Sequence, residues 1–467
     1  MPSSSPPLLG PFVFTLALGL GLFVATPEVN ARPLTLDEAV TLALSHSRAI
    51  QKAQAQVTEL DATRKSTRGA FLPTLKVNAN VFVWDSELPF DLGDFGKLLA
   101  NLIPPGTPAM SFGNIRDQVT STVSVTLAQP LTPLWQISKG YSAIKHGKRA
   151  AQEMVKKSRV DVAADTRKAY IQLKQAQAGV KIAQSAVAQV QAQLKVAKAF
   201  FDAGVLEKKE VLKAEVGLAR ARGALVQTRA GFQLAQAALA LKLGLDPDDP
   251  IEAQERFGEP SPQTKTFGQY LQEALTQRPM LAAIKAQQAS AHAQTSAAKG
   301  ALIPTVVALA TYQHSEGQGF IMPKNAFFAG GTLSWSFDWG KDYYKLAAAK
   351  SKVRQAELDE KRLKDGIFLQ VKQAFLALQT ARQQLVIARA AITQAQEAFR
   401  IEESKFKQAS ATTTDVLNAQ LALNSARLTE INALFGFYIA RSELARATAA
   451  PFHAAAASSQ PSTGTKR

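Results

Sequence analysis

Cysteine is absent from this chain of 467 residues, and its absence excludes several kinds of site at once. Without a thiol we expect no disulfide scaffold, no cysteine-ligated zinc, no thiol catalysis and no lipidated N-terminal cysteine. The five histidines lie far apart in sequence and form no paired metal-binding motif. They are His46, His146, His292, His314 and His453. We therefore expect neither a bound metal nor another cofactor.

Motifs for catalysis and for nucleic-acid recognition are also missing. The sequence shows no Walker loop, nucleophile elbow or paired-carboxylate pattern, so we expect that it is not an enzyme. Lys and Arg total 54 against 37 Asp and Glu, a net charge of +17. These basic residues are spread along the chain without a clustered patch or a groove-reading motif. Such spreading is typical of solvated helix faces, and no nucleic-acid partner is expected.

Long uninterrupted apolar runs are scarce. Residues 12–25 form an apolar run that is too short and too rich in glycine for a membrane-spanning helix. The sequence Val29-Asn30-Ala31 suits signal-peptidase cleavage, so we predict a signal peptide at 1–31 rather than an N-terminal anchor, although its start carries no Lys or Arg. No later stretch predicts a transmembrane helix. The Ala, Ser, Pro and Thr-rich residues 449–467 predict a disordered tail.

The chain carries an internal duplication. Ala70-Phe71-Leu72-Pro73-Thr74 recurs as Ala301-Leu302-Ile303-Pro304-Thr305, and Phe201 with Val211-Leu212 recurs as Phe406 with Val416-Leu417. We predict a first repeat at 32–243, a Pro- and Asp-rich linker at 244–267 and a second repeat at 268–448.

Each repeat has the same predicted order of elements: a helical stretch, two strands, a very long helix and a return helix. The first helical stretches are about Thr35–Gly69 and Gly268–Lys299. The strands are predicted at about 74–84, 119–128, 305–312 and 328–337, and the later helices at about 137–202, 208–243, 342–407 and 413–447. Aromatic residues are only 7% of the chain, a composition that favours long, closely packed helices.

Two periodicities support this order. In the second strand of each repeat, apolar residues alternate with Thr and Ser, which places one kind of side chain on each sheet face. The apolar residues are Val123, Val125, Leu127, Leu333, Trp335 and Phe337. In the long helices, large residues recur every seven positions with alanines three positions later, which predicts coiled-coil seams. The large residues are Leu173, Val180, Val187, Leu194 and Phe201, and then Leu378, Leu385, Ile392, Phe399 and Phe406.

The strands constrain the assembly. Four strands cannot close a barrel, and open sheet edges are not tolerated in a bilayer. Strands of about ten residues with one apolar face suit an outer-membrane barrel. Three copies would supply twelve strands, an even number that permits closure around a hydrated pore. The alternative that remains open is a β-hairpin attached to coiled coils in a soluble or surface scaffold protein that binds partners.

At this point the sequence resembles the TolC family of outer-membrane efflux channel proteins over about residues 34–447. The matching motifs are Leu34-Thr35-Leu36-Asp37-Glu38-Ala39, the two Leu/Ile-Pro-Thr strand starts, and the turns Phe201-Asp202-Ala203-Gly204-Val205-Leu206 and Phe406 through Asp415-Val416-Leu417. The resemblance implies a mainly α fold with a small β part. It implies a homotrimer in which a twelve-stranded β-barrel, embedded in outer-membrane lipid, continues as an α-helical coiled-coil barrel through the periplasm.

The resemblance also implies function. Family members are passive exit ducts of tripartite efflux pumps or type I secretion systems, joined by a periplasmic adaptor to an inner-membrane transporter of the RND, ABC or MFS type. By resemblance the adaptor docks on two turns, comprising Gly204, Val205, Leu206, Ala409, Ser410 and Ala411. The exported cargo, whether drug, metal or protein, does not follow from the sequence.

The resemblance places a periplasmic gate at Asp415 and Asn418. Relatives carry two acidic residues one helical turn apart there, whereas this chain has Asn418 at the second position and Ala411 where an arginine is often found. A gate with one carboxylate per chain is therefore expected. The alternative for Asp415 is helix capping after Thr412, and for Glu210 we expect only a capping role.

Overall fold

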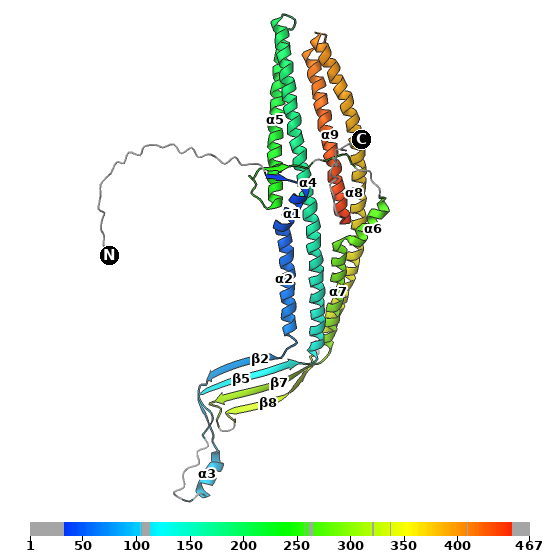
Figure 1. The fold of residues 1–467 in the computed structure, drawn as a ribbon. Coiled ribbons are helices and arrows are strands. Elements are labelled where there is room, and N and C mark those ends of the chain that lie inside the picture. The colour runs from blue at the N-terminus through cyan, green and yellow to red at the C-terminus, as the bar shows by residue number, and fades with distance from the viewer. Residues whose placement is uncertain are drawn as a thin grey trace, which may run out of the picture.

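The computed structural model describes residues 32–102, 104, 113–255, 257–260, 265–319, 322–336, 338–408 and 410–450. The predicted signal peptide and residues 451–467 of the predicted tail lie outside this range. The molecule is elongated, with a β-sheet at one end and the tips of two helical hairpins at the other (Figure 1). Among the helices of the described residues, none has an apolar stretch long enough to cross a membrane.

The main sheet has four strands in the order β2-β5-β7-β8, and all neighbours are antiparallel. The strands are β2 (Thr74–Val83), β5 (Val119–Pro130), β7 (Thr305–Glu316) and β8 (Asn325–Ser334). Each repeat contributes one hairpin, and the β5–β7 pairing joins the two repeats. The fourth strand begins and ends earlier than the predicted 328–337, so Trp335 follows the strand rather than lying within it, and Phe337 is outside the described residues.

Four long helices form the two hairpins that reach away from the sheet. They are α4 (Pro133–Asp202), α5 (Lys208–Leu243), α8 (Lys341–Lys407) and α9 (Thr413–Thr448). With 70 residues, α4 is about 105 Å long at 1.5 Å per residue. Neither α4 nor α8 contains an internal proline, so each continues from the sheet to the tip (Figure 1). The duplicated helix–strand plan is confirmed.

The helical stretch that opens each repeat is broken in two, which the sequence analysis did not predict. The pieces are α1 (Leu36–His46) and α2 (Arg48–Gly69), then α6 (Phe267–Gln277) and α7 (Pro279–Lys299). Ser47 and Arg278 at the breaks have extended backbone angles. The break at Arg278 has a clear local cause, because a residue that precedes proline disfavours the helical conformation.

The segment predicted as a linker takes part in the fold. Within it, β6 (Ile251–Ala253) pairs in parallel with β1 (Arg32–Leu34) at the start of the described chain. Tyr170 of α4 holds this pair in place, because its hydroxyl donates to the Leu34 carbonyl at 2.8 Å and accepts from the Glu255 amide at 3.0 Å. Burial raises the pKa of Tyr170 to about 12. The linker residues therefore brace the middle of the molecule.

The hairpin loop between β2 and β5 contains further short elements. These are β3 (Leu88–Pro89), α3 (Gly93–Leu102) and β4 (Asn114–Arg116), while the 3₁₀ turn η1 (Gly300–Leu302) leads into β7. The segment between the first two predicted strands is thus partly structured, with β3 and β4 paired antiparallel.

The large residues of the predicted seams are buried or half-buried except near the first tip. Leu173, Leu194, Leu378, Leu385 and Phe406 are all buried. In contrast, 41% of the surface of Phe201 is exposed. Its neighbour Phe200 packs against Phe406 instead, with ring centroids 6.0 Å apart. The seven-residue spacing ends there because α4 stops at Asp202 and the chain begins to turn.

Candidate functional site

The strand register places many of the apolar side chains of the four strands on one face of the sheet. Val77 pairs with Val125, Val125 with Tyr312, and Tyr312 with Phe327. Since partners in a register share a face, this face also holds Val123, Leu127 and Leu333. The opposite face carries most of the hydroxyl and amide side chains, including Thr126 and Thr311, whose oxygens are 3.0 Å apart, together with Leu309 and Phe328.

The apolar face and both sheet edges have no cover in the described part of the chain. Val123 is 44% exposed and Leu333 71% exposed, although both are large apolar side chains. The edge strands β2 and β8 each have a single neighbour in the sheet. A sheet with an uncovered apolar face and unpaired edges is incomplete by itself, because the free N–H and C=O groups of an edge strand need a partner.

At the opposite end, the first hairpin turns through Gly204, whose φ of +72° lies in the left-handed region that favours glycine. The amide of Val205 donates to the Phe200 carbonyl at 2.8 Å, a hydrogen bond typical of a glycine-terminated helix. Val205 is exposed at the tip, whereas Leu206 packs against a buried cluster that includes Val211 and Phe406. Of these predicted docking residues, Gly204 and Val205 therefore lie on the surface.

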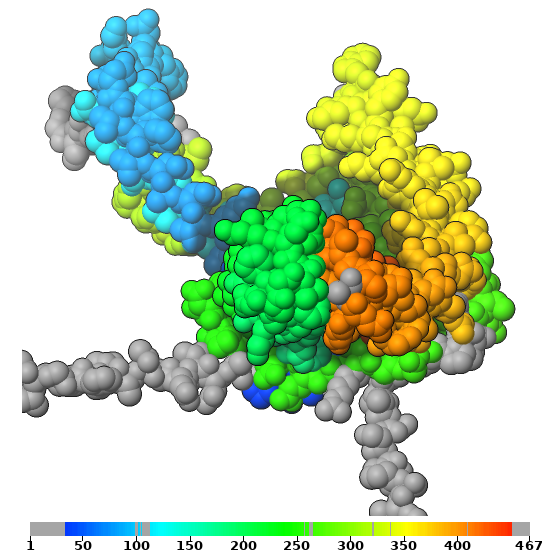
Figure 2. All heavy atoms as spheres, turned by 90° about the horizontal axis from the view of Figure 1, so that it is seen from above, coloured from blue at the N-terminus to red at the C-terminus, as the bar shows by residue number. Residues whose placement is uncertain are grey.

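The second hairpin turns through Ser410, which is exposed and bonds back to the helix it follows. Its amide and its hydroxyl both donate to the Lys405 carbonyl, at 2.9 and 3.0 Å. Ala411 is half-buried against the same cluster as Leu206, and Ala409 lies outside the described residues. The two tips lie side by side, as the green and orange surfaces in Figure 2 show.

Asp415 forms the reciprocal capping box of α9. Its carboxylate accepts from the Thr412 amide at 3.0 Å and hydroxyl at 2.7 Å, and the Asp415 amide donates to the Thr412 hydroxyl at 3.3 Å. These hydrogen bonds lower the pKa of Asp415, helped by the charges of Lys405 and Lys213. Within one chain, Asp415 therefore caps the start of α9, as the second of its two expected roles predicts. Asn418 is exposed one turn further along α9.

Glu210 is not a capping residue, contrary to the prediction. The residue at the N-cap of α5 is Glu207, and Glu210 is buried, with 7% of its surface exposed. Its carboxylate lies 2.8 Å from the Lys213 ammonium, and its pKa is lowered mainly by Lys213 and also by Thr413 of α9. Glu210 is therefore a buried carboxylate on α5 that faces the start of α9, where the two hairpins meet at the tip.

The sequence contains a signal for the position of Glu210. The offset that aligns Phe201 with Phe406 also aligns Glu210 with Asp415, so the two acids occupy equivalent positions after the two turns. They differ in surroundings, because Asp415 bonds to its own helix start while Glu210 faces the start of α9.

Comparisons with known proteins give one consistent result. The family model described as "Outer membrane efflux protein" matches residues 39–245 and 270–450. Outer membrane efflux protein BepC of Brucella suis is 25% identical over 347 residues, covering 73% of this chain and 74% of BepC. Protein CyaE of Bordetella pertussis is 26% identical over 377 residues, covering 76% of this chain and 71% of CyaE.

The fold has solved counterparts as well. The outer membrane channel CmeC of Campylobacter jejuni superposes with a TM-score of 0.72 at 16% identity, covering 88% of this chain and 85% of CmeC. The chain therefore belongs to the outer membrane efflux protein family, and it is an efflux channel of the outer membrane that extends into the periplasm.

Proposed function

We propose that three copies of this chain assemble into one duct. The observation that carries this proposal is the four-stranded sheet with one apolar face and two open edges. Pairing of β8 in one copy with β2 in the next would satisfy both edges and close a barrel around the Thr and Ser face. The apolar face, including Val123, Val125, Leu127, Leu333 and Trp335, would then contact outer-membrane lipid; Phe337 is assigned to it from the sequence alone.

The long helices extend the duct into the periplasm. Because α4 and α8 run without interruption from sheet to tip, three copies would surround a continuous tunnel. A periplasmic adaptor would dock at the tips, at Gly204, Val205 and Ser410, and link the duct to an inner-membrane transporter of the RND, ABC or MFS type. The transporter would supply the energy, in a tripartite pump or a type I secretion system.

The proposed gate lies beside the docking turns. In a trimer, three Asp415 carboxylates and three Asn418 amides would ring the periplasmic mouth. The lowered pKa keeps Asp415 ionised at neutral pH, so the ring would carry negative charge and attract cations. Capping and gating are compatible, because Asp415 is exposed while it accepts from Thr412.

A pair of substitutions on one strand tests the barrel. Val125→Arg would place a charge on the lipid face at a cost of about 2–4 kcal/mol, whereas Thr126→Arg would point into the hydrated pore. We expect Val125→Arg to abolish the detergent-extracted trimer and its planar-bilayer conductance, and Thr126→Arg to keep both. Equal tolerance of the two variants, or a stable monomer in buffer without detergent, would contradict the proposed duct.

A further inference from the structure

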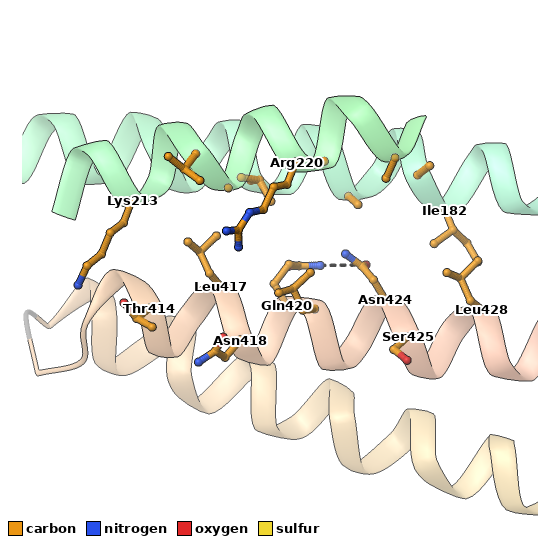
Figure 3. Close-up of a pocket in the computed structure, with 18 of the residues that line it drawn as sticks. Ile182, Lys213, Arg220, Thr414, Leu417, Asn418, Gln420, Asn424, Ser425 and Leu428 are labelled. Atoms are coloured by element: carbon orange, nitrogen blue, oxygen red, sulfur yellow. Dashed lines mark hydrogen bonds between the residues drawn. The ribbon is translucent and has the colours of Figure 1, made fainter. Parts of the chain in front are cut away.

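A groove of about 990 Å³ runs between α5 and α9, with α4 as its floor (Figure 3). This volume is at the upper end of the range of small-molecule sites in proteins. Its walls are largely apolar, with Val216 on α5, Leu421 and Leu428 on α9 and Ile182 on α4. Val216 and Leu421 are more than half exposed, so the described chain leaves about half or more of each residue's surface uncovered.

The ionisable groups among the described lining residues are all basic. They are Lys209, Lys213 and Arg220. Lys209 is paired with Glu207 at 2.8 Å and Lys213 with Glu210 at 2.8 Å. No described residue forms an ion pair or hydrogen bond with the Arg220 guanidinium, which reaches from α5 toward α9 (Figure 3). The groove therefore contains one uncompensated positive charge against apolar walls.

The wall opposite Arg220 supplies a second donor. Gln420, which is buried, donates to the Gln189 side chain at 2.6 Å and to the Asn424 side-chain oxygen at 3.0 Å. Because the oxygen of Asn424 accepts this bond, its NH₂ group is available to donate. Arg220 and Asn424 thus offer N–H donors from the two sides of the same groove (Figure 3).

We propose that this groove binds an anionic amphiphile. A carboxylate or sulfate head group would lie between Arg220 and Asn424, and its apolar chain would cover Val216 and Leu421. Charged hydrogen bonds from a guanidinium are the strongest contacts available to such a head group. A single unpaired cation matches a single anionic head, whereas an acidic helix would need several. The proposal concerns a ligand site on the channel and does not depend on which pump the duct serves.

The absence of cysteine makes a direct test possible, because one introduced thiol can be labelled alone. Full-length Leu421→Cys protein in nanodiscs of neutral lipid would be treated with a maleimide, with or without laurate below its micelle concentration. Val226→Cys is the matched control, since Val226 is 66% exposed on α5 but does not line the groove, against 61% for Leu421. Dodecanol, with the same chain and no charge, tests the head group.

We expect laurate to slow labelling of Leu421→Cys several-fold, and to leave Val226→Cys unchanged. Adding Arg220→Gln should raise the laurate concentration for half-protection about tenfold, whereas Arg222→Gln, outside the lining, should not. Equal protection by dodecanol, or no effect of Arg220→Gln, would overturn the proposal.

A thiol that is unreactive without laurate would also overturn it, because a neighbouring subunit would then fill the groove. Bilayer conductance of each variant reports channel assembly separately.

Discussion

Replacing Glu210 with glutamine should loosen the contact between the two hairpin tips of one chain. Glu210 is buried on α5, 2.8 Å from Lys213, and Thr413 in the first turn of α9 helps to stabilise its carboxylate. The first turn of a helix carries a positive potential that favours a nearby negative charge. Glutamine keeps the shape of the side chain but removes the negative charge that faces both Lys213 and the start of α9.

The expected loss is about 1.5 kcal/mol. A negative charge beside the first turn of a helix contributes up to about 2 kcal/mol where it is partly buried, and we take about 1.5 kcal/mol because Glu210 is buried beside the start of α9. Since about 1.4 kcal/mol changes an equilibrium tenfold, the tips should separate about ten times more often. The pKa of Glu210 is lowered in the folded chain, so its contribution is present above the unfolded pKa and is lost as the pH falls through the folded pKa.

Hydrogen exchange measures this opening directly. At neutral pH, peptides that cover residues 413–420 of the Glu210→Gln protein should exchange about tenfold faster than in the parent. Glu207→Gln is the matched control, because Glu207 is exposed and pairs with Lys209 at the start of the same helix, α5. Unchanged exchange in Glu210→Gln, or an equal increase in Glu207→Gln, would refute the reasoning.

Three further predictions test the gate, the docking turns and the contact of Tyr170 with β1 and the linker. Asp415→Asn, which keeps an acceptor for capping, should weaken cation block or raise single-channel conductance in planar bilayers; no change would remove Asp415 from the gate. A photo-crosslinking residue at Val205 should trap the co-expressed adaptor, whereas one at Val226 should not. Tyr170→Phe loses two hydrogen bonds and should lower the free energy of unfolding by about 2 kcal/mol. Tyr438→Phe loses one hydrogen bond and should lower it by about 1 kcal/mol. Equal losses for the two variants in urea denaturation would contradict this prediction.

Periodic features were predictable from the sequence because they depend on the geometry of single elements. Alternation along β5 identified Val123, Val125 and Leu127 as one face, and the register confirms that they share it. Seven-residue spacing identified the seams, of which Leu173 and Leu378 are buried. The repeated motifs gave the duplication. Each signal follows from the period of a strand or helix and needs no knowledge of its neighbours.

Contacts between distant segments could not be predicted in this way. The pairing of β5 with β7, the strand that the linker adds beside Leu34, and the packing of Phe200 in place of Phe201 all depend on how the two repeats meet. Glu210 and Asp415 follow equivalent turns in sequence, yet one is buried and the other exposed. The sequence by itself determined the four main strands, the long helices and their apolar faces. Only the tertiary structure decided what each face contacts, because that depends on surfaces brought together from both halves of the chain.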